Sequence, residues 1–163
     1  MTARPDLPCP AVAHCVPGLK ARTPAEAVVE ISRAFVASKA LGEAARKSLV
    51  KNVLEREAQA STGIGNGVAL PHPTAPGDVK RCVKELLVGV GVSPAGIAFQ
   101  AVDGAPVHTV FLVAAPSTEE YLRVARLVAG LARDPNWPRL LRRCTTAAQI
   151  VDLVQQAWQG ARR

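Results

Sequence analysis

Apolar residues recur with a helical period near the start of the chain, and the pattern changes to continuous apolar runs in the middle. Val28, Ile31 and Phe35 fall on one face of a helix, which predicts an amphipathic helix over residues 24–38. Thr23-Pro24-Ala25-Glu26 at its start is a capping box with proline at the first helical position. A second helix is predicted over residues 43–60, so the first third of the chain is mainly helical.

The middle of the chain predicts strands and the loops that join them. Residues 86–92 and 107–115 are nearly unbroken apolar runs, which suit strands covered on both faces of a sheet. Residues 61–67 hold three alternating glycines, each costing about 1 kcal/mol in a helix relative to alanine, and therefore predict a loop. Residues 68–70 predict a short extended piece after this loop.

Helices are predicted again in the last third of the chain. Ser117 or Thr118 caps a helix that runs to Arg133, and two shorter helices are predicted over residues 138–143 and 146–158. The order of helices, strands and helices predicts an α/β fold, in which a mixed β-sheet is flanked by helices on both sides.

Length and composition are those of one folded domain. The 163 residues are 48% hydrophobic, which excludes intrinsic disorder, and no apolar run reaches the roughly 18 residues of a membrane span. We expect a single domain over residues 16–160, preceded by an irregular lead-in over residues 1–15. The start of the chain has no continuous apolar segment of the kind found in signal peptides, so the expected location is the cytoplasm.

The cysteines and two of the histidines suggest no metal or cofactor. The chain has four scattered cysteines and no CxxC pair, which suits reduced thiols. Cys9, His14 and Cys15 lie close in sequence, but their spacing matches no common zinc site and no second ligand pair follows. We expect His14 to be solvated in the lead-in, and His108 to be packed or exposed at a strand edge without a catalytic role.

A formal net charge of +7 raises the question of an anionic partner. The basic residues gather in the C-terminal half, where arginines spaced along helices are more often a solvated face. Aromatic residues make up only 4% of the chain, which leaves few platforms for stacking bases, and no DNA-reading motif is present. Nucleic-acid binding is therefore the weakest of the functional hypotheses, and no such partner is expected.

The stretch from Leu54 to His72 combines residue types that suit phosphoryl chemistry. Glycines let backbone N–H groups surround an anion, and the hydroxyls of Ser61 and Thr62 add donors. Arg56 carries a permanent charge, and a neutral ring nitrogen of His72 can act as a nucleophile. The glycines lack the lysine of a P-loop and precede a strand, which excludes a dinucleotide fingerprint. From spacing alone, the Pro-His-Pro sequence could equally be a rigid surface turn.

The segment LEREAQASTGIGNGVALPH resembles the active-site stretch of the fructose/mannitol-type (type 2) enzyme IIA of the bacterial phosphoenolpyruvate-dependent sugar phosphotransferase system (PTS), a family that includes the nitrogen-regulatory IIA proteins. Softer similarity covers about residues 15–158. The resemblance implies a mixed sheet flanked by helices and a phosphotransferase that works through a phosphohistidine.

By this resemblance, His72 accepts a phosphoryl group from phospho-HPr and Arg56 stabilises the phosphohistidine. The residues expected to line the pocket are Ser61, Thr62, Gly63 and Tyr121. Tyr121 stands where the family has a second histidine. Sugar-specific members pass the group to a IIB domain. The alternative is a nitrogen-regulatory role, in which phosphorylation switches binding to protein partners.

Three positions depart from the family pattern. Tyr121 replaces the usual second histidine; its phenol can donate a hydrogen bond but supplies no imidazolium charge. Pro73 removes a backbone N–H beside His72, and Thr74 stands where a basic residue is common. These departures leave reduced or altered phosphotransfer open as an alternative, and charge stabilisation of the phosphorylated state then depends more heavily on Arg56.

Overall fold

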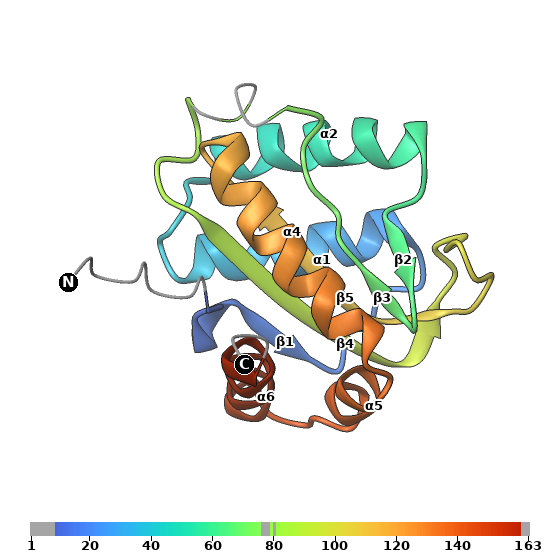
Figure 1. Ribbon diagram of the computed structural model, residues 1–163. Helices are drawn as coiled ribbons and strands as arrows, with labels where there is room; N and C mark the ends of the chain where they lie inside the picture. Colours follow the sequence, from blue (N-terminus) through green and yellow to red (C-terminus); the bar gives the residue numbers. More distant parts are fainter. Residues whose placement is uncertain (1–8, 76–78, 80, 161–163) are drawn as a thin grey trace.

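The computed structural model describes residues 9–75, 79 and 81–160, and its strands form one mixed sheet in the order β1-β4-β5-β3-β2 (Figure 1). Strands β1 and β4 are parallel, β4 and β5 antiparallel, β5 and β3 parallel, and β3 and β2 antiparallel. The elements, in chain order, are η1 (Val12–His14), β1 (Cys15–Pro17), α1 (Pro24–Ala37), α2 (Glu43–Gln59), β2 (Gly63–Gly65), β3 (Val68–Ala69), β4 (Leu87–Ile97), β5 (Val107–Ala114), α4 (Thr118–Arg133), α5 (Asn136–Arg142) and α6 (Ala147–Gly160). The α/β class and the helices on both sides of the sheet are confirmed.

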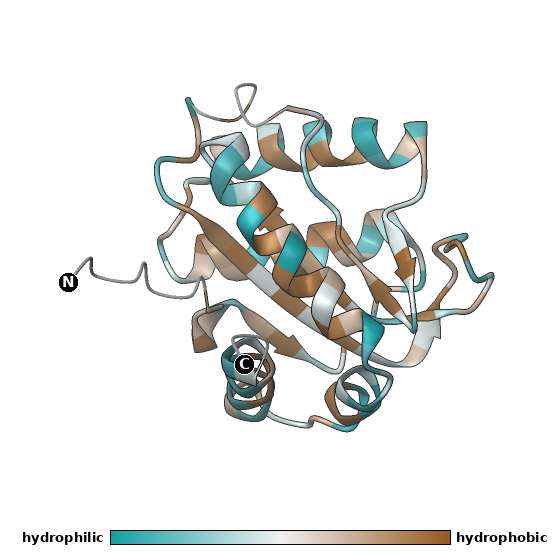
Figure 2. Cartoon of the chain, in the orientation of Figure 1, coloured by the Kyte–Doolittle hydropathy of each residue, from teal (hydrophilic) through white to brown (hydrophobic). Residues whose placement is uncertain are grey.

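Helices cover both faces of the sheet and bury an apolar core on each. Side chains of α1 and α2 pack on one face, and those of α4, α5 and α6 pack on the other. Successive residues of β5 alternate between the two cores: Val110 and Leu112 face α1 and α2, whereas Phe111 and Val113 face α4 and α6. Figure 2 shows the resulting apolar band along the central strands, with polar residues on the outer helix faces. An apolar run without alternation is therefore the signature of these doubly covered strands.

The caps predicted from sequence form at the helix starts. Thr23 Oγ1 accepts a hydrogen bond from Glu26 N at 3.2 Å, and Pro24 begins α1. The Glu26 carboxylate completes the turn from the other side by accepting from Arg22 N at 2.7 Å. Ser117 caps α4 in the same way, accepting from Glu120 N at 3.3 Å. Within the described ranges, none of the helices combines the length and apolar character that crossing a membrane requires.

The N-terminal segment is more regular than the sequence indicates. Residues 12–17 form η1 and β1, and β1 pairs with β4, so the expectation of an irregular lead-in is wrong there; residues 1–8 of that lead-in lie outside the described part. His14 is also not solvated. It is 8% exposed, its Nε2 lies 2.8 Å from Ser38 Oγ, and its ring meets Phe35 edge-on at 4.9 Å. The segment is held by pairing of β1 with β4 and by contacts of η1 and β1 with both α1 and α6.

Candidate functional site

His72 follows a short stretch of chain that is fixed along β5. Val68 and Ala69 pair with β5 in parallel, and Val113 N then donates to Pro71 O at 3.0 Å. His72 comes next and is half-buried at the C-terminal end of β5. Sheet pairing up to the preceding proline therefore fixes the point at which this side chain leaves the backbone.

A hydrogen bond to the backbone fixes the tautomer of His72. Its Nδ1 lies 2.8 Å from Leu70 O, and because a carbonyl can only accept, Nδ1 carries the proton. In the neutral ring the lone pair is then on Nε2. Burial lowers the pKa of His72, and the nearby positive charge of Arg56 lowers it further, against the opposing effects of the Leu70 carbonyl and the Glu57 carboxylate. At neutral pH the site thus holds a neutral imidazole with one available lone pair.

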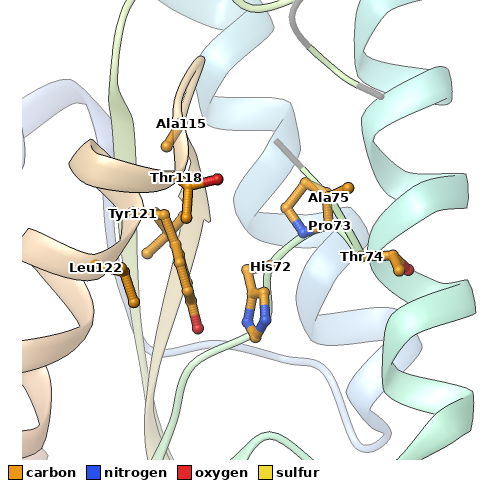
Figure 3. Close-up of a pocket in the computed structure, with 9 residues that line it drawn as sticks. His72, Pro73, Thr74, Ala75, Ala115, Thr118, Tyr121 and Leu122 are labelled. Atoms are coloured by element: carbon orange, nitrogen blue, oxygen red, sulfur yellow. The ribbon is translucent and has the colours of Figure 1, made fainter. Parts of the chain in front are cut away.

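Tyr121 lies against this imidazole, and both side chains line a cavity of about 270 Å³. The two ring centroids are 4.5 Å apart, and the ring planes are tilted by 31°. Figure 3 shows the phenol descending from the first turn of α4 beside the His72 ring, with Pro73 and Ala75 on the opposite wall. Burial raises the pKa of Tyr121, with a smaller lowering by the charge of Arg56, so its hydroxyl keeps its proton and can donate.

Arg56 lies in the last turn of α2, near enough for its charge to act on the site. Its Nη1 donates to Ala60 O at 2.9 Å, and its charge lowers the pKa of both His72 and Tyr121. The guanidinium is not among the described groups that line the cavity, but its electrostatic influence extends to both rings. The arginine thus stands beside the pocket with a structural contact to its own helix end.

Glu57, the next residue, ties α2 to the glycine-rich segment. Its carboxylate accepts from Thr62 N at 3.0 Å and from Thr62 Oγ1 at 2.5 Å. This clamp joins the helix end that carries Arg56 to β2, and through β3 to the segment that carries His72. Sequence reasoning assigned Glu57 no role, although its place directly after Arg56 and five residues before Thr62 was a usable signal.

The chain before β3 is fixed by hydrogen bonds of Ser61, Thr62 and Gly63. The Ser61 hydroxyl donates to Phe99 O and accepts from Gly63 N at 3.1 Å, while the Thr62 hydroxyl is bonded to Glu57. None of the three is among the described residues that line the cavity. A Cβ on Gly63 would lie 2.6 Å from Ala101 Cβ, so this glycine permits close packing of the backbone. These residues fix the backbone that supports the site, and their direct contact with a phosphate stays a prediction.

Two further lining residues come from α4. Thr118 and Leu122 stand one turn apart with Tyr121 between them, and Leu122 is 42% exposed. The first turn of α4 thus forms one wall of the cavity, and the Pro73 side forms the other. Sequence reasoning identified only Tyr121 on this helix, because nothing local in the sequence shows that the start of α4 meets the segment after β3.

The sequence model of the family "Phosphoenolpyruvate-dependent sugar phosphotransferase system, EIIA 2" matches residues 14–157. A nitrogen regulatory protein of Klebsiella oxytoca is 37% identical over 108 residues, which are 64% of this chain and 64% of that protein's length. A nitrogen regulatory protein of Pseudomonas aeruginosa is 30% identical over 129 residues, covering 78% of this chain and 80% of its own.

The fold is also found in solved structures. The mannitol IIA protein of Escherichia coli superposes with a TM-score of 0.75 at 22% identity, covering 88% of this chain and 97% of that one. The same protein in complex with phosphorylated mannitol IIB gives a TM-score of 0.74 at 21% identity, covering 90% and 96%. These structures share the fold. The family match over residues 14–157 and the 30% identity to the Pseudomonas aeruginosa protein show that the chain belongs to the EIIA 2 family of the phosphoenolpyruvate-dependent sugar phosphotransferase system.

Proposed function

We propose that this chain is a phosphocarrier that accepts a phosphoryl group on Nε2 of His72 from phospho-HPr and passes it to a IIB-type partner. The observation that carries the proposal is the bond from His72 Nδ1 to Leu70 O, which leaves the lone pair on Nε2 in a half-buried ring at a cavity.

In the proposed step, the Nε2 lone pair attacks phosphorus as the nitrogen–phosphorus bond of the donor breaks. The electron pair of that bond returns to the donor's imidazole. The His72 ring keeps its proton on Nδ1 against Leu70 O and takes on the positive charge of a phosphoimidazolium. The lowered pKa of His72 supports this role because a protonated ring has no lone pair to offer. Transfer onward is the same exchange with the partner as nucleophile.

The phosphorylated state brings about two negative charges into the pocket, and they need compensation. Arg56 is the proposed counter-charge, since its field already reaches His72. The proposed further donors are the Tyr121 hydroxyl and the amino-terminal turn of α4, whose positive dipole end is at Thr118. We assign Ser61, Thr62 and Gly63 to holding the frame of this site.

Phosphotransfer from phospho-HPr carrying ³²P tests the proposal. The expected product is one acid-labile, base-stable phosphate per chain, located on His72 by mass spectrometry. The variant His72→Ala should take no label, while His108→Gln, a matched change at a half-buried histidine on β5, should be labelled like the wild type. Equal labelling of His72→Ala, or no labelling of a folded wild type, would contradict the proposal.

The alternative is that phosphorylation of His72 serves as a regulatory switch rather than a relay to sugar. Both curated relatives described above are named as nitrogen regulatory proteins, which favours this alternative. The negative charge of a phosphoryl group at the half-exposed pocket would change which protein surface can bind there. Mixing the phosphorylated chain with purified IIB proteins separates the two: rapid transfer followed by sugar phosphorylation supports the relay, and a stable phosphorylated form with altered partner binding supports the switch.

A further inference from the structure

A second cavity of about 390 Å³ lies at the other end of β5, between the turn that joins β2 to β3 and the helix α5. Its lining includes Asn66 on the turn, Asp103 on the loop before β5, and His108 on β5. His108 and Val113, which lines the His72 cavity, are five residues apart, or roughly 16 Å along a strand. The two cavities therefore share a strand but not a lining residue.

One wall of this second cavity is cationic. Arg139 and Arg142 are one turn apart on α5 and both line it. Arg139 Nη2 donates to Asn136 Oδ1 at 3.2 Å, and in the described part of the chain neither guanidinium forms an ion pair. Two guanidinium groups with free donors on one helix face are suited to binding an anion through paired hydrogen bonds.

The opposite wall offers hydrogen-bond acceptors. His108 Nδ1 lies 2.8 Å from Ser93 O and must donate to it, so the neutral ring presents Nε2 as an acceptor. Asp103 Oδ2 accepts from Asn66 N at 3.0 Å and Oδ1 accepts from Ala105 N at 3.1 Å, so backbone donors fix the carboxylate. Each carboxylate oxygen retains a second lone pair that can take a ligand hydroxyl.

We infer that this cavity is a binding site for a small hydroxylated phosphate monoester. Arg139 and Arg142 hold the phosphate, while His108 Nε2 and the Asp103 carboxylate accept hydrogen bonds from the hydroxyls. The cavity volume is within the usual range for a small-molecule site. The cationic and acceptor walls together select a ligand with both groups: an anion without hydroxyls leaves the acceptors unpaired, and a polyol without charge leaves the arginines unpaired.

Calorimetric titration of the full chain with glycerol 3-phosphate tests the inference, with inorganic phosphate and glycerol as partial ligands. Saturable binding of glycerol 3-phosphate is expected, with at least tenfold weaker binding of inorganic phosphate and no measurable binding of glycerol. Backbone amide NMR should move the signals of Asn66 and Asp103. Equal affinity for glycerol 3-phosphate and inorganic phosphate would contradict recognition of the hydroxyls. Absence of binding by glycerol 3-phosphate would overturn the inference that this cavity is a binding site.

Charge-matched variants locate the site. Arg139→Gln and Arg142→Gln each remove one exposed lining cation and should weaken binding by about tenfold. Arg143→Gln removes the same charge from the neighbouring exposed position, which lines a different depression, and should leave the affinity within about twofold. Equal losses in all three variants would show general attraction by a basic surface and overturn the inference. The variant His72→Ala should bind as the wild type does, so this result does not depend on phosphotransfer.

Discussion

Tyr121 is the aromatic side chain that lies against His72 in this pocket. Its ring lies 4.5 Å from that of His72, and its hydroxyl keeps its proton because burial raises its pKa. A second histidine could carry a positive charge at this place, whereas a phenol offers one neutral donor. The proposed phosphoryl group would therefore be held by one hydrogen bond here rather than by a charged partner.

The variant Tyr121→Phe should slow phosphotransfer to His72 by about ten- to a hundredfold, since it removes a hydrogen bond to a charged group worth about 1.5–3 kcal/mol and keeps the ring. Initial rates with labelled phospho-HPr measure this change. A rate equal to that of the wild type would show that the hydroxyl takes no part.

The variant Tyr121→His should produce a faster or longer-lived phosphorylated form, because an imidazolium adds charge beside the phosphate. The half-life of the phosphorylated chain after removal of the donor is the informative quantity. An unchanged rate and half-life would show that tyrosine and histidine are equivalent in this pocket.

At this scale, the motif identified His72 and Arg56 as the chemical candidates. His72 lines the cavity, whereas Arg56 lies in the last turn of α2, outside the described lining, and acts on His72 through its charge. The motif did not reveal that the Ser61 hydroxyl donates a hydrogen bond to Phe99 O and the Thr62 hydroxyl one to Glu57. Hydroxyl partners are fixed by contacts between elements, and Phe99 is 38 residues away from Ser61. His14 was misread for the same reason, because its burial depends on α1 packing over it.

At the scale of elements, glycines in β4 let side chains of α1 and of the segment before it pack directly on the strand. A Cβ on Gly89 would lie 2.5 Å from Ile31 Cγ2, and one on Gly91 would lie 2.5 Å from Leu19 Cδ1. In the sequence these glycines only interrupt an apolar run. The structure shows that they make room for large side chains of the facing layer.

The variant Gly89→Ala should lower the free energy of unfolding by about 1–3 kcal/mol, the usual cost of overpacking a core. Urea denaturation followed by circular dichroism measures it. Gly130→Ala on the exposed side of α4 is the matched control: nothing lies within 4 Å of the added Cβ, and stability should rise by about 0.5–1 kcal/mol. Equal effects of the two substitutions would contradict the close approach of α1.

The long elements could be predicted and the short strands could not. Caps and periodicity located α1, α2 and α4 within a few residues, because those signals are local. Strand β2 has three residues and lies inside the glycine-rich stretch, and β1 has three residues in the lead-in. Strand β1 pairs with the distant β4, and β2 pairs with its neighbour β3, which is itself paired with the distant β5. Local propensity does not record such pairing.

For the molecule as a whole, two histidines link stability to pH. Burial lowers the pKa of both His14 and His72, so the folded chain binds protons less readily than the unfolded chain. Stability is then fully present above the unfolded value of about 6.5 and falls as the pH drops toward the folded values.

The free energy of unfolding should therefore decrease as the pH falls below about 6.5. The variant His14→Gln should reduce this slope, by less than about 1.4 kcal/mol per pH unit, since one titrating group is removed. Denaturation curves at several pH values give the slope for each protein. Identical slopes would show that His14 does not contribute.

The stacking of Tyr121 on His72 has a practical consequence, because the chain contains one tyrosine. Selective isotopic enrichment of tyrosine would label one ring, whose centroid lies 4.5 Å from that of the imidazole. Attaching or removing a group at the imidazole changes the magnetic surroundings of that ring directly. The molecule thus contains its own spectroscopic probe, with which turnover could be followed in real time without any attached dye.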